Sequence, residues 1–179
     1  MSEEQTEGVK ATADDVEAGS ANTSESGIQE QPEVEEEKQP ESWFITGANG
    51  NLGQRLIRRL LSEGAMITAV VRSGRAEREL TRVFSATSQL RIEVIDYAET
   101  MLLAQAAYGA QYAVHLVGIL KSSKNATYAT AHESSCTSLS RALKDTSVEH
   151  ITYLSILGAK PESNNACLAS KGRAERILY

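Results

Sequence analysis

The sequence predicts an α/β fold in which a five-stranded parallel sheet is covered by helices on both faces. Short apolar runs alternate with amphipathic stretches of about ten residues or more, as in strands joined by crossover helices. The apolar runs are nearly continuous, which suits strands that are buried on both faces. Glycines follow several of the amphipathic stretches, where helices commonly end. We expect a doubly wound sheet with the strand order 3-2-1-4-5.

The first half of this pattern starts after residue 41. Trp43–Thr46 form a short apolar run that Gly47 stops, which predicts a strand. From Leu52 to Glu63 apolar residues recur at helical spacing, and Gly64 marks the end of this helix. The next three elements are expected to be a strand over 67–71, a helix over 76–88 and a strand over 90–95.

The second half repeats the alternation. Gly109 closes a helix expected over 99–108, and the apolar run Tyr112–Val117 predicts the fourth strand. His115 within that run is interpreted as a packing residue rather than a base. The remaining elements are expected to be a helix over 127–144, a strand over 151–156 and a helix over 168–178.

Residues 1–41 differ in composition from the rest of the chain. They hold 13 of the 24 acidic residues, two basic residues and no aromatic residue. Such a segment cannot bury enough apolar surface to offset its ordering entropy, so we expect a disordered, solvated acidic tail. Residues 42–179 carry 16 basic and 11 acidic residues and are long enough for one packed domain.

The composition also argues against several classes of protein. No apolar stretch approaches the ~18 residues of a membrane helix, and the acidic start does not resemble a signal or transit peptide. Cys136 and Cys167 make no disulfide framework, and no cysteine–histidine cluster predicts a metal site. The basic residues are scattered rather than striped, which argues against nucleic-acid binding. A reduced, cytoplasmic protein is therefore expected.

The segment Thr46–Gly53 reads T-G-A-N-G-N-L-G and lies between the first strand and the first helix. The first glycine permits a tight turn, the second lets the backbone approach a pyrophosphate, and the third lets the helix pack on the sheet. The free N–H groups and the positive dipole end of the helix N-terminus suit phosphates. The motif predicts a dinucleotide site made by Gly47, Ala48, Asn49, Gly50, Asn51, Leu52 and Gly53.

The end of the second strand bears on which dinucleotide binds. An acidic residue there would accept a hydrogen bond from the ribose 2′-hydroxyl of NAD, but this chain has Arg72, Ser73 and Arg75, with no acid until Glu77. The planar fork of an arginine can hold a 2′-phosphate, so NADP(H) is favoured over NAD(H). Because Arg78 and Arg82 follow, the alternative that Arg72 merely begins a basic, solvated helix stays open.

The spacing T-G-x-x-G-x-x-G resembles the fingerprint of the extended and atypical branches of the short-chain dehydrogenase/reductase superfamily, whose members have a Rossmann fold. The resemblance covers residues 42–179 and is strongest to the NmrA-like and complex I accessory-subunit-like groups. Other landmarks that agree are V-R-S at 71–73, D-Y at 96–97, H-L-V-G at 115–118, L-S at 154–155 and S-K at 170–171.

The resemblance implies further contacts with the cofactor. Asp96 and Tyr97 would lie near the adenine, although a helix-capping or turn role for Asp96 is an open alternative. The cofactor would run along Leu116, Val117 and Gly118 on the fourth strand.

The resemblance also implies a catalytic serine, tyrosine and lysine, and here the chain departs from the pattern. Ser155 and Lys171 match the serine and the lysine, but Cys167 stands where the tyrosine would be. A thiol is too short to reach the carbonyl group that the phenol would protonate. Cys167 is either a small filler or an oxidisable thiol beside Lys171.

Two functions stay open on the sequence alone. The first is an NADP(H)-binding sensor or assembly module without hydride transfer, and the second is an NADP-dependent oxidoreductase or epimerase acting on a small carbonyl or sugar-nucleotide substrate. The resemblance implies a further region, beyond the last helix, that closes the substrate pocket. This chain stops before it, and both a fragment and a truncated paralogue stay open as explanations. The last helix or the neighbouring sheet edge is expected to receive a protein partner or a second copy.

Overall fold

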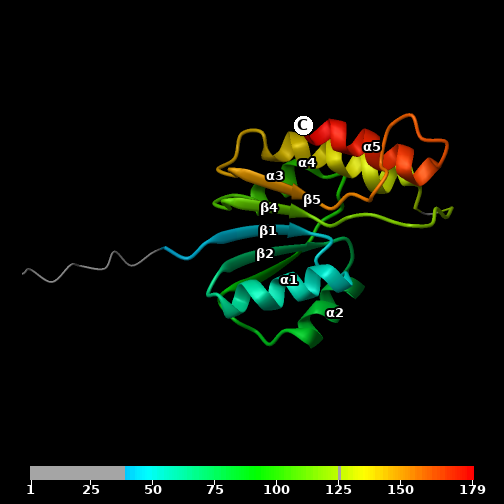
Figure 1. The fold of residues 1–179 in the computed structure, drawn as a ribbon. Helices are drawn as coiled ribbons and strands as arrows, with labels where there is room; N and C mark the ends of the chain where they lie inside the picture. The colour runs from blue at the N-terminus through cyan, green and yellow to red at the C-terminus, as the bar shows by residue number, and fades with distance from the viewer. Residues whose placement is uncertain (1–38, 125) are drawn as a thin grey trace, which may run out of the picture. The chain divides into compact units, whose positions relative to one another are not determined.

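The computed structural model describes residues 39–124 and 126–179 (Figure 1). The acidic tail expected over 1–41 falls almost entirely outside these residues. One parallel sheet of five strands has the order β3-β2-β1-β4-β5, which confirms the expected fold. The strands are β1 (Ser42–Thr46), β2 (Met66–Val71), β3 (Leu90–Val94), β4 (Tyr112–His115) and β5 (His150–Tyr153).

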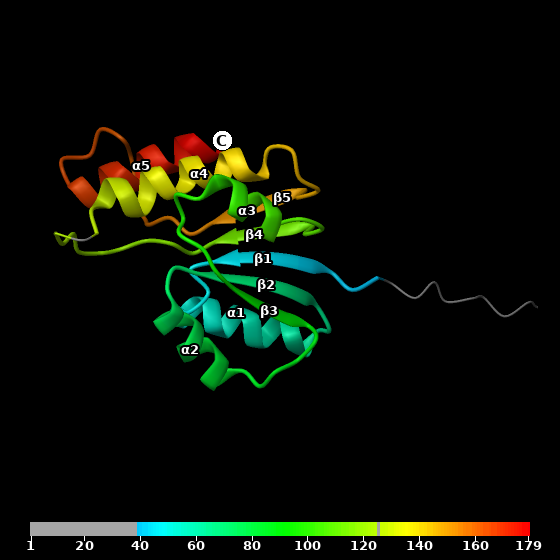
Figure 2. The same cartoon turned by 180° about the vertical axis from the view of Figure 1, so that it is seen from behind.

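Helices cover both faces of the sheet, as Figures 1 and 2 show. On one face lie α1 (Asn51–Ser62) and α2 (Gly74–Val83), and on the other lie α3 (Thr100–Ala106), α4 (Ser135–Leu143) and α5 (Ala166–Leu178). The side chains of successive strand residues point to opposite faces of the sheet. Ile45 belongs to the core beneath α1 and α2, whereas Phe44 belongs to the core beneath α3 and α4.

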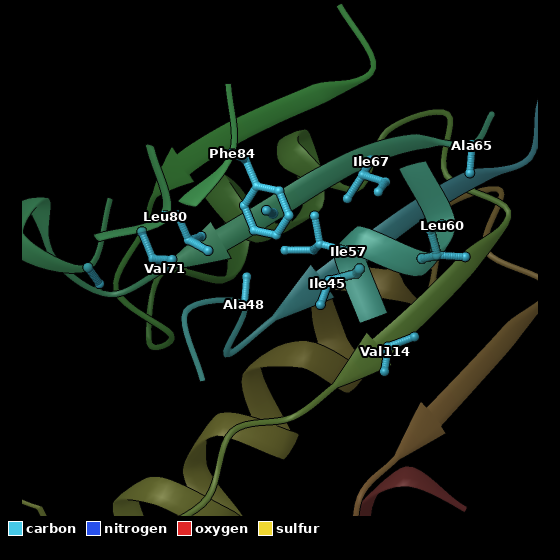
Figure 3. Close-up of a cluster of buried hydrophobic side chains, with 12 residues drawn as sticks. Ile45, Ala48, Ile57, Leu60, Ala65, Ile67, Val71, Leu80, Phe84 and Val114 are labelled. Atoms are coloured by element: carbon cyan, nitrogen blue, oxygen red, sulfur yellow. The ribbon is translucent and has the colours of Figure 1, made fainter. Parts of the chain in front are cut away.

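The core beneath α1 and α2 fixes the direction of α1 (Figure 3). Ile57 of α1 and Leu80 of α2 are fully buried in one apolar cluster with Ile45 and Val71 of the sheet. Burying a side chain of this size contributes about 1.5–3 kcal/mol. This packing holds the N-terminus of α1 at the carboxyl end of β1.

Several elements end earlier than the sequence pattern predicts. The helix expected over 76–88 ends at Val83, because Phe84 adopts an extended conformation and packs into the core. The fifth strand ends at Tyr153, because its partner β4 ends at His115. The long helix expected over 127–144 begins with a π-helical segment, η1 (Ala129–Ser134), before α4.

Within the described residues, no helix has the length and apolar character needed to span a membrane.

The buried face of α2 can be tested by truncation. Leu80→Ala should lower the free energy of unfolding by about 2–5 kcal/mol, because it removes a fully buried side chain and leaves a cavity. Val83→Ala on the same helix is the matched control, since Val83 is 43% exposed. Urea unfolding followed by circular dichroism measures both. Equal losses in the two variants would contradict the assignment of the buried face.

Candidate functional site

The three glycines of the Thr46–Gly53 motif differ in how strongly the surrounding structure excludes a side chain. Gly47 has a φ of +73°, and a Cβ there would lie 2.9 Å from the carbonyl carbon of Leu116. A Cβ at Gly53 would lie 2.5 Å from the carbonyl oxygen of Ala48, so α1 packs directly on the loop. At Gly50 a Cβ would meet only the Gly47 oxygen, at 3.3 Å, and φ is an ordinary −66°. The chain's own packing thus explains Gly47 and Gly53 far better than Gly50.

The N-terminus of α1 has unused donors. Gly50 is the N-cap residue and supplies no side-chain acceptor, while its carbonyl accepts from the N–H of Gln54. In the described part of the chain, no acceptor is present for the backbone N–H groups of Asn51, Leu52 and Gly53. These amides stand at the positive end of the helix dipole, which is suited to an anion.

Two adjoining cavities lie at the carboxyl ends of the strands. One of about 260 Å³ is lined by Gly47, Asn49, Gly50, Ser73, Leu116, Gly118 and Ile119. The other, of about 410 Å³, is lined by Asp96, Ala98, Thr130, Ser134 and Ser135. Arg72, Tyr97, Val117 and Ala131 line both. Together they form what we call the nucleotide cleft, and it gathers most of the residues that the sequence predicts for the cofactor.

Tyr97 stands between the two cavities. Its hydroxyl accepts from the N–H of Gly47 at 2.9 Å and donates to the carbonyl of Val70 at 3.4 Å. Burial raises the pKa of Tyr97, so the phenol stays protonated and able to donate. The side chain therefore ties the segment after β3 to the first turn of the glycine loop. Beside it, the Asp96 carboxylate accepts from the N–H of Ala98 at 3.0 Å, which is the turn role left open by the sequence.

Two arginines lie near the start of α2, and one of them, Arg72, lines the cleft. Arg72 is exposed at the end of β2, and Ser73 caps α2 by accepting from the N–H of Ala76 at 3.3 Å. Arg78 turns back along the helix, with Nη1 3.5 Å from the position of a Cβ on Gly74. Neither Arg72 nor Arg78 has an ion-pair partner among the described residues, whereas Arg75 pairs with Glu79 at 3.0 Å. The sequence pattern indicates Arg78 only as part of a basic, solvated helix and does not predict that its side chain lies near Gly74.

Lys171 of α5 lies behind Gly118 at one end of the cleft and is only 7% exposed. Its Nζ donates to the carbonyl of Leu154 at 2.7 Å and lies 4.4 Å from the ring centroid of Tyr153. A Cβ on Gly118 would lie 3.0 Å from the same nitrogen. Burial lowers the pKa of Lys171, and the neighbouring thiols Cys136 and Cys167 oppose that shift.

Two further groups gather at the same end, around Ile119. Cys167 directs its Sγ to the carbonyl of Ile119 at 3.7 Å. The Nε2 atom of His132 lies 3.1 Å from the Ile119 nitrogen and 3.2 Å from its oxygen. His132 comes from η1 and is fully buried, and no periodic sequence signal marks it, because the helical pattern does not reveal a π-turn.

Ser155 is separated from this group. It lines a different cavity, of about 480 Å³, together with Ile151, Tyr153, Glu175, Leu178 and Tyr179. Its Oγ is buried and has no hydrogen-bond partner among the described residues. The structure therefore places Lys171 beside Gly118 and Cys167 beside Ile119, two residues that line the nucleotide cleft. It places Ser155 beside the outer edge of the sheet.

An ion pair ties η1 to α5. Glu133 accepts from Nε and Nη2 of Arg173 at 2.8 and 2.9 Å, and also from the hydroxyl of Ser170 at 2.8 Å. Such a two-pronged pair fixes orientation as well as distance. It holds the segment that carries Ala131 and His132 against the helix that carries Lys171.

A buried polar chain lies beneath the cleft. His115 Nδ1 lies 2.6 Å from Thr46 Oγ1, and Nε2 lies 3.2 Å from Ser135 Oγ. The Ser135 hydroxyl donates to the carbonyl of Ala131 at 2.7 Å, so it accepts from Nε2–H, and Nδ1 accepts from Thr46. Burial holds the imidazole neutral and lowers the pKa of His115 to about 3.

A family model described as NAD(P)H-binding matches residues 47–178. The chain belongs to this NAD(P)H-binding family. The expected resemblance is confirmed at this level, and a nicotinamide dinucleotide is the cofactor class of the family. The match contains every residue predicted to contact the cofactor.

Solved structures share the fold of this NAD(P)H-binding chain. A yeast methylglyoxal/isovaleraldehyde reductase in complex with NADPH is 18% identical, with a TM-score of 0.64 over 76% of this chain and 51% of the reductase. A uronate dehydrogenase variant from Agrobacterium tumefaciens in complex with NAD is also 18% identical, with a TM-score of 0.61 over 78% of this chain and 55% of the dehydrogenase. The chain thus spans about half the length of these relatives.

A curated relative matches a shorter stretch of the NAD(P)H-binding chain. It is a fatty acid hydroxylase from Mycosarcoma maydis, 34% identical over 85 residues, which are 47% of this chain and 28% of the hydroxylase. The match is too short to carry an activity over to this chain.

The neutral state of His115 makes stability depend on pH. The folded pKa of about 3 lies below the ordinary value of 6.5, so the unfolded chain takes up the proton first. This contribution to stability is complete above pH 6.5 and is lost as the pH falls towards 3, which amounts to about 3 kcal/mol between pH 7 and pH 4. Urea unfolding at these two pH values should show a smaller difference in His115→Gln than in the unmodified protein.

The control for this measurement is His150→Gln, since His150 is an exposed histidine on β5. It should keep the pH dependence of the unmodified protein. The same steep loss of stability in His115→Gln would show that the buried imidazole is not its source.

Proposed function

We propose that this protein binds NADP(H) in the nucleotide cleft and works as a cofactor-binding sensor or assembly module rather than as a hydride-transfer enzyme. The observation that carries the proposal is Gly50, where the chain itself gives little reason for a missing side chain. A side chain there would occupy the space in front of the free amides of α1. That space suits a pyrophosphate.

This position of the pyrophosphate sets the direction of the rest of the dinucleotide. The adenosine half would lie towards Arg72, Asp96 and Tyr97, in the larger cavity. The nicotinamide half would run along 116–119 towards Lys171. Ala48, Asn49, Asn51, Leu52 and Gly53 would contribute backbone, because they form the loop and the first turn of α1.

The arginines at the start of α2 support the preference for NADP(H). A 2′-phosphate on the adenosine ribose would face Arg72 and Ser73, where an acidic residue is absent. Arg78 adds a second cation beside Gly74. Guanidinium groups without a carboxylate partner are suited to a phosphate.

The far end of the cleft supports a role without hydride transfer. Cys167 directs its thiol to the Ile119 carbonyl, and Ser155 lines another cavity. The hydroxyl of Tyr153 is buried, and burial, together with the neighbouring Cys136, raises its pKa far above the ordinary value. We therefore infer that no phenol near Lys171 supplies a proton to a substrate carbonyl.

The second candidate function is an NADP-dependent oxidoreductase or epimerase for a small carbonyl or sugar-nucleotide substrate. Lys171 favours it, since this lysine is held at the nicotinamide end of the cleft. Its proton donor would have to be recruited from elsewhere than position 167. Turnover of a carbonyl substrate with NADPH that survives Cys167→Ala but not Lys171→Met would support this alternative.

The outer edge of β5 is the proposed place for a protein partner or a second copy. β5 is an edge strand of the described sheet, and Ile151 and Leu154 are 37% and 48% exposed. An edge with free backbone groups and exposed apolar side chains is suited to strand pairing. The adjoining cavity carries Leu178 and Tyr179 from the last helix.

The pyrophosphate site is tested by Gly50→Glu. The added carboxylate would fill the space before the amides of α1 and repel phosphate, so NADPH affinity should fall at least about a hundredfold, or by about 2.7 kcal/mol. Isothermal titration calorimetry measures the affinity. The melting temperature should change little, because a Cβ at Gly50 meets only one backbone oxygen, at 3.3 Å.

The matched control is Gly64→Glu, at the other end of α1, where a Cβ would have no heavy atom within 4 Å. Because Gly64 has a φ of +83°, this variant should lose stability yet keep NADPH affinity. Unchanged affinity in Gly50→Glu would remove the basis of the proposal.

The preference for NADP(H) is tested by Arg72→Asp. NADPH binding should weaken about tenfold to a hundredfold, while NADH binding should change little, because only NADPH carries the 2′-phosphate. Titration of both coenzymes gives the ratio, and Arg82→Asp, in the last turn of α2, is the control. Equal losses for both coenzymes would show that Arg72 does not select the phosphate.

A further inference from the structure

Lys171 is a buried cation without a balancing carboxylate. Its side chain is 7% exposed, and no ion pair involves it in the part of the chain that the structure describes. The groups that Nζ touches are the carbonyl of Leu154 and the ring face of Tyr153. Both are dipolar or quadrupolar acceptors that leave the full positive charge in place.

The other titratable groups that face Lys171 do not cancel this charge. They are the thiols of Cys136 and Cys167, the imidazoles of His115 and His132, and the carboxylate of Glu175, one turn further along α5. Burial raises the pKa of Cys136 to about 11, so its thiol is neutral, and the pKa values of both histidines are lowered, so they are neutral as well. Glu175 lines the cavity at the outer sheet edge rather than the nucleotide cleft.

The charge of Lys171 lies directly behind the wall of the cleft. Gly118 lines the cleft, and the position of its missing Cβ is 3.0 Å from Nζ and 3.6 Å from Nε2 of His132. With the pyrophosphate at α1 and the adenosine at Arg72, the nicotinamide ring must lie at this Gly118–Ile119 end. The ring of the oxidised coenzyme carries a positive charge, whereas the reduced ring is neutral.

We propose that Lys171 makes the nucleotide cleft selective for the reduced coenzyme, so that NADPH binds about tenfold more tightly than NADP⁺. The selectivity rests on the proposed function, since it requires a bound dinucleotide. Two unit positive charges repel one another, and they do so more strongly in the lower effective dielectric of a partly buried site than in water. Contacts to the phosphates, riboses and adenine are common to both forms and cancel in the ratio.

The selectivity would let a binding module respond to the supply of reduced coenzyme. A site without a proton donor does not consume its coenzyme, so its occupancy follows the supply of the reduced form. The cysteine at position 167 and the cation at position 171 would then serve one purpose. The cysteine takes the place of the proton donor, and the lysine makes binding depend on the charge of the nicotinamide ring.

The experiment is calorimetric titration of the full chain with NADPH and, separately, with NADP⁺. The unmodified protein should show a dissociation constant about tenfold lower for NADPH. Lys171→Met removes the charge but keeps an unbranched side chain, so the ratio should fall towards one, mainly through tighter NADP⁺ binding. Lys171→Arg keeps the charge and should keep a ratio well above one.

Lys144→Met is the matched control, because it removes the charge of an exposed lysine that follows α4, at the other end of the sheet from the cleft. It should leave both affinities as they are. The ratio in the unmodified protein tests the inference even if Lys171→Met does not fold. Equal affinities for the two forms, or a ratio that persists in folded Lys171→Met, would overturn the inference and leave the proposed function standing. Failure of both coenzymes to bind the unmodified protein would overturn the proposed function itself.

Discussion

The contact between Gly53 and Ala48 sets the geometry of the whole cleft. Because residue 53 has no side chain, the first turn of α1 lies against the backbone of the loop that leaves β1. The helix then presents its free amides at the carboxyl edge of the sheet, and Ile57 anchors the next turn in the core. A bulkier residue at position 53 would tilt α1 and move these donors away from the strand ends.

A second layer of neutral polar groups supports this arrangement from below. Thr46, His115 and Ser135 form a hydrogen-bonded chain from the end of β1, through β4, to the first residue of α4. In this hydrogen-bonded series each donor faces an acceptor, so burial leaves no nitrogen of the imidazole without a partner. The floor of the cleft is thus held by polar contacts of fixed geometry as well as by apolar packing.

Much of the fold follows from local patterns in the sequence. Apolar periodicity is enough to find the five strands, and the glycine spacing is enough to find the loop between β1 and α1, because both depend on neighbours along the chain. The π-turn that places His132 depends on packing between η1 and α5, which no periodicity reports. The orientation of Ser155 and the burial of Lys171 depend on how α5 lies across β5, so a motif match places these residues near one another without saying which cavity each side chain faces. The position of the Arg78 guanidinium near Gly74 is likewise a side-chain conformation that the sequence pattern does not predict.

The bridge from Glu133 to Arg173 and Ser170 has a mechanical consequence. It joins η1, whose Ala131 forms part of the cleft wall, to α5, whose C-terminal end lies beside the open sheet edge. The bridge couples the two segments, so a displacement of α5 would act on η1. A macromolecule bound to the C-terminal end of α5 would therefore act on the wall of the nucleotide cleft. A coenzyme bound in the cleft would oppose that displacement.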